Sequence, residues 1–207
     1  MNTDTIPTNI DGMNGLERGL KRAGDVIGAF LLMIVLSPLF LYIYIRQKMS
    51  SSGPAIYSQE RIGKGGRPFM IYKFRTMETD TESDGMPQLW QENDSRLTDF
   101  GRLLRRYHLD ELPQVWNVLK GDMSFVGYRP ERQYFIDKIM MHNSNYELLY
   151  VSRPGVTSVA TIENGYTYTM EKMLRRLDMD LDYLQHRSLW LDAKIIFRTV
   201  FNLNKLA

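Results

Sequence analysis

Two adjacent carboxylates, Asp110 and Glu111, are the residues of this sequence best suited to chemistry. They open the motif DELPQVWNVLKGD, in which apolar residues recur at helical spacing and Gly121 supplies a stop signal. Because proline is tolerated in the first turn of a helix, Pro113 places Asp110 at or beside a helix N-terminus. The preceding segment predicts a second amphipathic helix, and its polar face is basic: Arg102, Arg105 and Arg106. The pair therefore lies at a corner between a basic helix and the positive end of another helix.

This corner has two interpretations, and the local pattern leaves both open. Asp110 can simply cap the helix by accepting hydrogen bonds from backbone N–H groups. Alternatively, the helix dipole and the arginines keep Asp110 ionised, which makes it a nucleophile that needs no general base. The same positive field would hold a phosphate-bearing substrate, and Glu111 could hold a divalent ion that bridges phosphate oxygens. A glycosidase pair does not fit, because its carboxyl groups must face each other across a sugar ring at about 5–9.5 Å.

The composition excludes several other kinds of site. The chain has 207 residues, of which 26 are basic and 24 acidic, so a net charge of +2 gives no indication of nucleic-acid binding. It has no cysteine, which excludes disulfides, thiolate metal sites and cysteine nucleophiles. The histidines show no metal-ligand spacing and are interpreted as structural or surface residues: His108, His142 and His186.

An apolar run at residues 26–45 is long enough to reach across a bilayer core of about 30 Å. A single spanning helix is the simplest interpretation of its hydropathy. Pro38 argues against a straight span, since it removes a backbone donor in mid-run, where Ser37 can bond a freed carbonyl. Basic residues flank both ends and give no orientation bias: Arg18, Lys21, Arg22, Arg46 and Lys48. We therefore predict a re-entrant helix–break–helix hairpin over residues 18–48, preceded by a disordered segment over residues 1–17.

The segment PAIYSQERIGKGGRPFMIYKFRTM predicts a short β-hairpin, with apolar runs at residues 55–57 and 69–74 separated by glycines. Strand alternation places Lys73 and Arg75 on one face and Phe74 on the other. An edge strand with solvated charges is the alternative.

An acidic loop follows at residues 78–86 and partly imitates a calcium-binding loop. Gln91 stands where that motif needs a bidentate glutamate, so we interpret the segment as a solvated, flexible loop.

Two C-terminal segments, residues 133–151 and 181–201, predict amphipathic stretches. In the second, Trp190, Phe197 and Arg198 suit a membrane interface. Core packing explains the same stripe equally well.

The motifs together resemble a known family. LDELPQVWNVLKGDMSFVG, preceded by YKFRTM and by a membrane segment containing Ser37 and Pro38, is similar to the bacterial sugar transferases. These are small monotopic polyprenol-phosphate phosphoglycosyl transferases, and the similarity runs over about residues 19–199 with the motifs in the family's order. It implies an α/β but mostly helical fold, with a re-entrant hairpin, interfacial amphipathic helices and a small sheet element. Residues 49–207 would form a catalytic domain resting on the cytoplasmic face of the bacterial inner membrane.

The resemblance also implies a two-step reaction. Asp110 would attack the sugar-linked phosphate of a UDP-sugar and release UMP, and polyprenol phosphate would then take the phosphosugar from the enzyme. Mg²⁺ held by Glu111 would offset the negative charge, together with cationic residues. The phosphate-binding residues would be Lys73 (the family's active-site lysine in YKFRTM), Arg75, Arg105 and Arg129. The expected partners are a UDP-sugar, polyprenol phosphate and the lipid bilayer, and a homodimer is left open.

The chain departs from the family pattern in two loops. Tyr128 stands where the first proline of Pro-Arg-Pro is usual, so Arg129 is kept without it. Ser158 stands where glycine is common, and Thr161 near where glutamine is usual. The competing hypothesis is a catalytically silent, membrane-anchored scaffold for glycan assembly, and the intact carboxylate pair argues against it.

Overall fold

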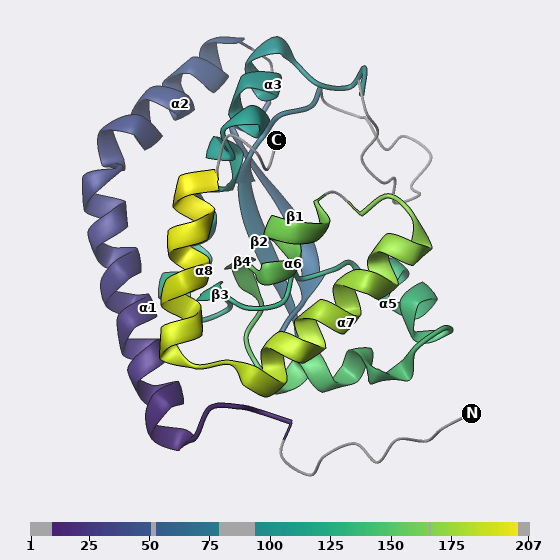
Figure 1. Cartoon of the computed structure of the whole chain (residues 1–207). Coiled ribbons are helices and arrows are strands. Elements are labelled where there is room, and N and C mark those ends of the chain that lie inside the picture. The colour runs from purple at the N-terminus through teal and green to yellow at the C-terminus, as the bar shows by residue number, and fades with distance from the viewer. Residues whose placement is uncertain (1–9, 51–52, 79–93, 166, 203–207) are drawn as a thin grey trace.

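The structure is a computed structural model that describes residues 10–50, 53–78, 94–165 and 167–202. The described chain is mostly helical, as predicted, and has two small two-stranded sheets where one small sheet element was expected (Figure 1). The helices are α1 Gly15–Val35, α2 Ser37–Ser50, α3 Asp99–Arg106, α4 Gln114–Lys120, α5 Gln133–Met140, α6 Val159–Asn164, α7 Met170–His186 and α8 Leu189–Asn202. The strands are β1 Ile56–Ile62, β2 Pro68–Phe74, β3 Ser124–Val126 and β4 Gly155–Thr157, and the 3-10 helices are η1 Lys64–Gly66, η2 Leu109–Glu111 and η3 Ser144–Val151. Apart from Glu78, the predicted acidic loop lies outside the described residues, as does Gln91.

Helices α1 and α2 run along one side of the molecule and bend by 62° at the break between them (left in Figure 1). Pro38 has no N–H to donate to the carbonyl of Ile34, and the Ser37 hydroxyl donates to that oxygen instead, at 2.8 Å. This is the contact that the sequence predicted for Ser37. No single helix of the described chain is long and apolar enough to cross a membrane, whereas the bent pair has that length and composition when taken together.

The predicted hairpin is confirmed as β1 and β2, which pair antiparallel with Ile56 opposite Phe74. Its turn contains Gly65 and Gly66 at φ of 70° and 68°, a conformation that side chains with a Cβ rarely adopt.

Both faces of β2 are covered by other elements. Ile71 packs in one apolar cluster with residues of α1 and α4, and Phe74 packs in another with residues of α2 and α3. Arg75 is buried, and the side chain of Lys73 is 20% exposed. The alternative is therefore wrong about solvated charges, although β2 is an edge strand of its two-stranded sheet.

Both predicted C-terminal amphipathic stretches are broken. Residues 133–151 form α5 and then η3, because Asn143 is extended and its side chain accepts a backbone N–H two residues later. Residues 181–201 contain the end of α7 and most of α8, because Arg187 is extended and the Ser188 hydroxyl caps the start of α8.

Exposed apolar side chains gather along α1, α2 and α8, which lie on one side of the molecule (Figure 1). On α8, Trp190 is 70% and Phe197 is 62% exposed, so core packing does not explain this stripe. The α1 and α2 members that are more than half exposed include Ile27, Phe30, Leu31, Ile34, Val35, Leu41 and Tyr42.

The prediction of disorder over residues 1–17 is wrong for residues 10–17. The buried carboxylate of Asp11 accepts hydrogen bonds from Arg187 at 2.6 and 2.7 Å and from Arg18 at 2.9 Å. Asn14 then caps α1 through a capping box, which starts the helix before Arg18. A contact with a residue at the far end of the chain orders this segment, and its local polar composition gives no sign of that.

Replacing Asp11 with asparagine should lower stability in a pH-dependent way. Burial alone would raise the pKa of Asp11, but Arg187, the Met13 N–H and Arg18 lower it from 3.8 to about 2. A depressed carboxyl pKa adds stability above the unfolded value, and the gain is lost as the pH falls through the folded value. We expect a loss of about 1–2 kcal/mol at pH 7. The difference in unfolding temperature between Asp11→Asn and the unsubstituted protein should shrink between pH 7 and pH 3, and a constant difference would contradict this account.

Candidate active site

Asp110 and Glu111 lie in η2, between the basic helix α3 and α4. Pro113 follows η2 at φ −60°, and α4 ends at Gly121, which has a left-handed φ of 100°. The predicted helix and its stop signal are therefore confirmed, with the carboxylate pair in a separate turn just before the helix. Among the residues that the structure describes, no side chain makes a capping hydrogen bond at the start of η2 or α4, so capping does not account for Asp110.

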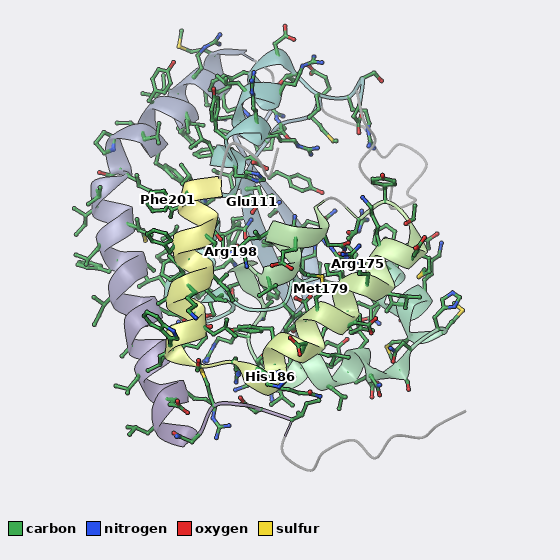
Figure 2. All side chains as sticks on the ribbon, viewed as in Figure 1. Glu111, Arg175, Met179, His186, Arg198 and Phe201 are labelled. Atoms are coloured by element: carbon green, nitrogen blue, oxygen red, sulfur yellow. The ribbon has the colours of Figure 1, made fainter. Side chains whose placement is uncertain are left out.

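Glu111 is the centre of a buried charge cluster. Lys73 Nζ, from β2, lies 2.5 Å from Glu111 Oε1, and Arg129 Nη2, from the loop after β3, lies 3.3 Å from the same oxygen. Burial alone would raise the pKa of Glu111, but the charges of Lys73 and Arg129 outweigh burial and hold that pKa well below its usual range. Figure 2 shows Glu111 inside the molecule, whereas Arg175 and His186 lie at the outside of α7.

Asp110 has a different environment from its neighbour. It is 6% exposed, and burial raises its pKa, with a further rise from the charge of Glu111 that Lys73 and Arg105 only partly oppose. That arginines and a helix dipole keep Asp110 ionised stays a prediction: Lys73 and Arg129 contact Glu111, and burial is the largest influence on the pKa of Asp110. Two adjacent carboxyl groups with pKa values driven in opposite directions are typical of a site that gives them different tasks.

The other two predicted phosphate-binding residues, Arg105 and Arg75, make different contacts near the carboxylate pair. Arg105, on α3, donates its Nε–H to Thr76 Oγ1 at 3.0 Å, and its charge lowers the pKa of Asp110. Arg75 is buried at the end of β2, where its main-chain carbonyl accepts a hydrogen bond from Gln47 of α2. Arg105 thus acts on the site through its charge, whereas the main chain of Arg75 joins the hairpin to α2 and the phosphate-binding role of its side chain stays a prediction.

Two residues that the sequence did not single out fix α4 in place. The buried side chain of Asn117 accepts the N–H of Tyr72 at 3.1 Å and donates to the carbonyl of Met70 at 2.7 Å, so α4 is held against β2. Arg22 of α1 donates to the carbonyls of Val118 and Leu119 at the other end of the helix, at 2.7 and 3.0 Å. A polar residue on the apolar face of a predicted helix was the available signal for Asn117.

His108 also lies at the site, although its spacing predicted only a structural or surface role. It has a φ of 53°, and it is the non-glycine residue with positive φ in the described chain. Its carbonyl accepts the Glu111 N–H, and its ring lowers the pKa of both carboxyl groups. Histidine tolerates this left-handed conformation better than most residues, and the conformation is what turns the chain from α3 into η2.

The donor set at the site fits a magnesium ion that is shared with a substrate. No group of three or more Asp, Glu or His side chains that could enclose a metal occurs within the described ranges. Mg²⁺ commonly takes one or two carboxylates and completes its shell with waters and substrate phosphates. Lys73 and Arg129 both contact Oε1 of Glu111, and the Glu111 carboxylate is the kind of ligand that such an ion takes, so Glu111 fits this role.

Comparison with known proteins identifies relatives over nearly the whole chain. Residues 16–205 match the family model described as bacterial sugar transferase. The chain is 40% identical over 206 residues to an Escherichia coli UDP-glucose:undecaprenyl-phosphate glucose-1-phosphate transferase, which covers 98% of this chain and 44% of that protein. It is 43% identical over 182 residues to the protein of the same name in Caulobacter vibrioides, covering 87% and 68% of the two chains.

A relative with another sugar in its name is equally similar. The chain is 39% identical over 181 residues to the Aeromonas hydrophila UDP-N-acetylgalactosamine-undecaprenyl-phosphate N-acetylgalactosaminephosphotransferase, covering 87% of this chain and 43% of that protein. The chain thus spans less than half the length of the Escherichia coli and Aeromonas relatives.

Substitutions of Lys73 and Glu111 should have non-additive effects on the free energy of unfolding, because the two side chains form an ion pair. Lys73→Met leaves Glu111 buried beside one cation fewer, so we expect a loss of about 2–3 kcal/mol in the free energy of unfolding. Glu111→Gln in the same chain should recover part of that loss, with a coupling of about 1 kcal/mol or more in a double-mutant cycle. Lys120→Met is the control, since Lys120 pairs with Asp122 at the surface with 48% of its side chain exposed. Strictly additive losses for Lys73 and Glu111 would contradict the pairing.

Proposed function

The chain belongs to the bacterial sugar transferase family, and on that premise we propose that it transfers a phosphosugar from a UDP-sugar to polyprenol phosphate. The products would be a polyprenol diphosphate sugar and UMP. The names of the relatives support this assignment, because the proteins in Escherichia coli, Caulobacter and Aeromonas are all named as undecaprenyl-phosphate transferases. The reaction would begin the membrane stage of glycoconjugate assembly.

The observation that carries the proposal is the convergence of three separate segments on one carboxylate pair. Lys73 comes from β2, Arg129 from the loop after β3, and both meet Glu111 beside the buried Asp110. Such an arrangement presents two cations to a diphosphate and a carboxyl group to its phosphorus. A catalytically silent scaffold has no need of a buried, oppositely tuned carboxylate pair, so the enzyme is the better explanation.

In the proposed mechanism Asp110 is the nucleophile. Its carboxylate oxygen forms a bond to the sugar-linked phosphorus, the bond from that phosphorus to the bridging oxygen breaks, and UMP leaves with the electron pair. An oxygen of polyprenol phosphate then attacks the same phosphorus, which releases Asp110 and forms the new diphosphate. Splitting the reaction in this way suits a soluble donor and a lipid acceptor, which need not be bound together.

The cations would stabilise the charge that develops on the phosphate oxygens. Lys73 and Arg129 would bind the donor diphosphate, and Arg105 would oppose the effect of burial on Asp110 by favouring its ionised form. Mg²⁺ held by Glu111 would supply further charge neutralisation between the phosphates. The Arg129 guanidinium offers the two-pronged geometry that phosphate oxygens prefer.

The bent pair α1–α2 would enter one leaflet of the cytoplasmic membrane and return to the cytoplasmic face. The break at Pro38, the Ser37 hydrogen bond and the exposed apolar side chains of both helices support this topology. The exposed stripe on α8 with Trp190 and Phe197 would lie in the interface, where aromatic side chains are favoured. The catalytic residues would then face the cytoplasm, where UDP-sugars are found.

Intact-protein mass spectrometry tests the nucleophile. After incubation with a UDP-sugar and Mg²⁺ but no lipid acceptor, the protein should gain the mass of a phosphosugar, and the adduct should map to Asp110. Asp110→Asn keeps the shape of the side chain, so it should fold normally and gain no adduct. An adduct that persists in Asp110→Asn, or that maps to Glu111, would overturn the assignment.

The control for this experiment is the neighbouring carboxylate. Glu111→Gln should keep the nucleophile and shift the magnesium concentration needed for half-maximal UMP release upward, by about tenfold or more. An unchanged magnesium dependence would remove Glu111 from the metal site.

Single-cysteine labelling tests the topology, and the chain is convenient for it because it has no cysteine of its own. Cysteines at Thr8 and Ser51 should both react only with a reagent supplied from the cytoplasmic side. Pro38→Leu restores the missing backbone donor, so it should shift the hairpin toward a straight span and expose the Thr8 site to the periplasm. Periplasmic labelling at Thr8 without the Pro38 substitution would favour a spanning helix.

A further inference from the structure

A second buried charge cluster lies behind the loop that carries Arg129. Glu131 Oε1 lies 2.5 Å from Arg176 Nη2 of α7, and Glu131 Oε2 lies 3.1 Å from Arg61 Nη1 of β1. The side chain of Glu131 is 10% exposed, and those of Arg176 and Arg61 are 7% and 19% exposed. We refer to these three residues as the Glu131 cluster.

Hydrogen bonds join the Glu131 cluster and β1 to the main chain that follows Arg129. Arg61 Nη1 donates a second hydrogen bond, to the carbonyl of Pro130 at 3.1 Å. The N–H of Ile62, the next residue of β1, donates to the carbonyl of Glu131 at 3.0 Å. The two peptide groups after Arg129 are thus attached to the hairpin that also carries Lys73.

The main chain at and before Arg129 is fixed as well. The Gly155 N–H donates to the carbonyl of Tyr128 at 2.8 Å. A Cβ at Gly155 would lie 2.1 Å from the nitrogen of Gly127, so the main chain at the start of β4 touches the main chain that follows β3. The Arg129 N–H donates to the carboxyl group of Asp180 on α7. The side chain of Arg129 extends away from these main-chain attachments to Glu111.

Stability alone does not explain so many buried polar groups. A buried ion triad is often replaceable by apolar side chains with no loss of stability. Asp180 Oδ1 and Tyr128 Oη are fully buried and have no hydrogen-bond partner within the described chain, which costs about 1–3 kcal/mol for each such group. Burial also raises the pKa of Asp180 to about 7, although Arg176 and Arg129 oppose the rise. The polar groups therefore fit a role in orientation better than one in packing.

We propose that the Glu131 cluster positions Arg129, so that its guanidinium meets Glu111 and, if the proposed function holds, the donor phosphate. A planar guanidinium has to be oriented as well as near, because its paired N–H groups must point at the oxygens that they bind. Holding its peptide groups on β1 and α7 gives that orientation before substrate arrives. Glu131 is a positioning residue, since it acts through Arg129 and not on the reacting atoms.

The first experiment measures the position of Arg129 without relying on turnover. Arg129→Ala and Glu111→Gln define a double-mutant cycle in the unfolding of the full chain in lipid nanodiscs, and its coupling reports the contact between the two side chains. The same cycle is then repeated with Glu131→Gln present, which keeps the shape of the side chain and removes its charge. We expect the coupling to fall to less than half. An unchanged coupling would overturn the proposal.

The second experiment measures UMP release from a UDP-sugar with undecaprenyl phosphate and Mg²⁺. Glu131→Gln should lower kcat/KM by about 10- to 100-fold, the range expected when a distant change misplaces a substrate-binding group. In an Arg129→Ala background the same substitution should have little further effect, because its route to the site is gone. Glu60→Gln, at an exposed glutamate of β1 next to Arg61, is the matched control and should leave kcat/KM unchanged. Equal losses from Glu131→Gln in both backgrounds would show a merely structural role and overturn the proposal.

A milder variant covers the case in which Glu131→Gln folds poorly. Arg61→Lys keeps the charge opposite Glu131 but removes the fork that also reaches Pro130, so it should give a smaller loss that likewise disappears with Arg129→Ala. If no UDP-sugar gives UMP with the unsubstituted protein, the proposed function fails, and the unfolding cycle alone decides whether the Glu131 cluster positions Arg129.

Discussion

The ion pair between Lys73 and Glu111 is the contact on which the rest of the site depends. It joins the β-hairpin to the turn that carries both carboxyl groups, and it does so where the Glu111 side chain is 13% exposed. A carboxylate in such a place remains ionised only because cations offset the loss of hydration. Once Lys73 and Arg129 are committed to Glu111, Asp110 is left with burial as the dominant influence on its pKa. The opposite pKa shifts of Asp110 and Glu111 therefore follow from the contact of both cations with Glu111.

The scaffold around that contact couples the bent helix pair to the carboxylate turn. Asn117 makes hydrogen bonds to the main chain of β2 of the kind that a third strand would make, so α4 is attached to the strand that carries Lys73. Arg22 of α1 donates to the carbonyls of Val118 and Leu119 in the last turn of α4, where backbone carbonyls run short of intrahelical partners. The helix with the exposed apolar face is therefore attached directly to the helix that follows Asp110 and Glu111. In the proposed membrane setting, this attachment would set the height of the carboxyl groups above the bilayer.

Much of the local structure could be predicted from the sequence, because its causes lie within a few residues. The break at Pro38, the glycine turn of the hairpin and the end of α4 at Gly121 each follow from backbone chemistry at one or two positions. The errors fall where distant contacts decide. Residues 10–17 are ordered by Arg187, and the predicted stretch over residues 181–201 is broken at the same arginine, which is drawn into the buried pair with Asp11. Neither effect has a signal in the local pattern.

For the candidate site, the sequence by itself determined the carboxylate pair, its place before a short helix, and a set of cations that includes Lys73, Arg105 and Arg129. Only the tertiary structure decided which cation meets which carboxyl group, that His108 and Asn117 belong to the site, and that the main chain of Arg75 is bonded to α2. The physical reason is that residue type and spacing fix the conformation of a turn, whereas hydration and charge act through space. Lys73 and Arg129 lie 38 and 18 residues from Glu111 along the chain, and folding alone brings them to the same oxygen.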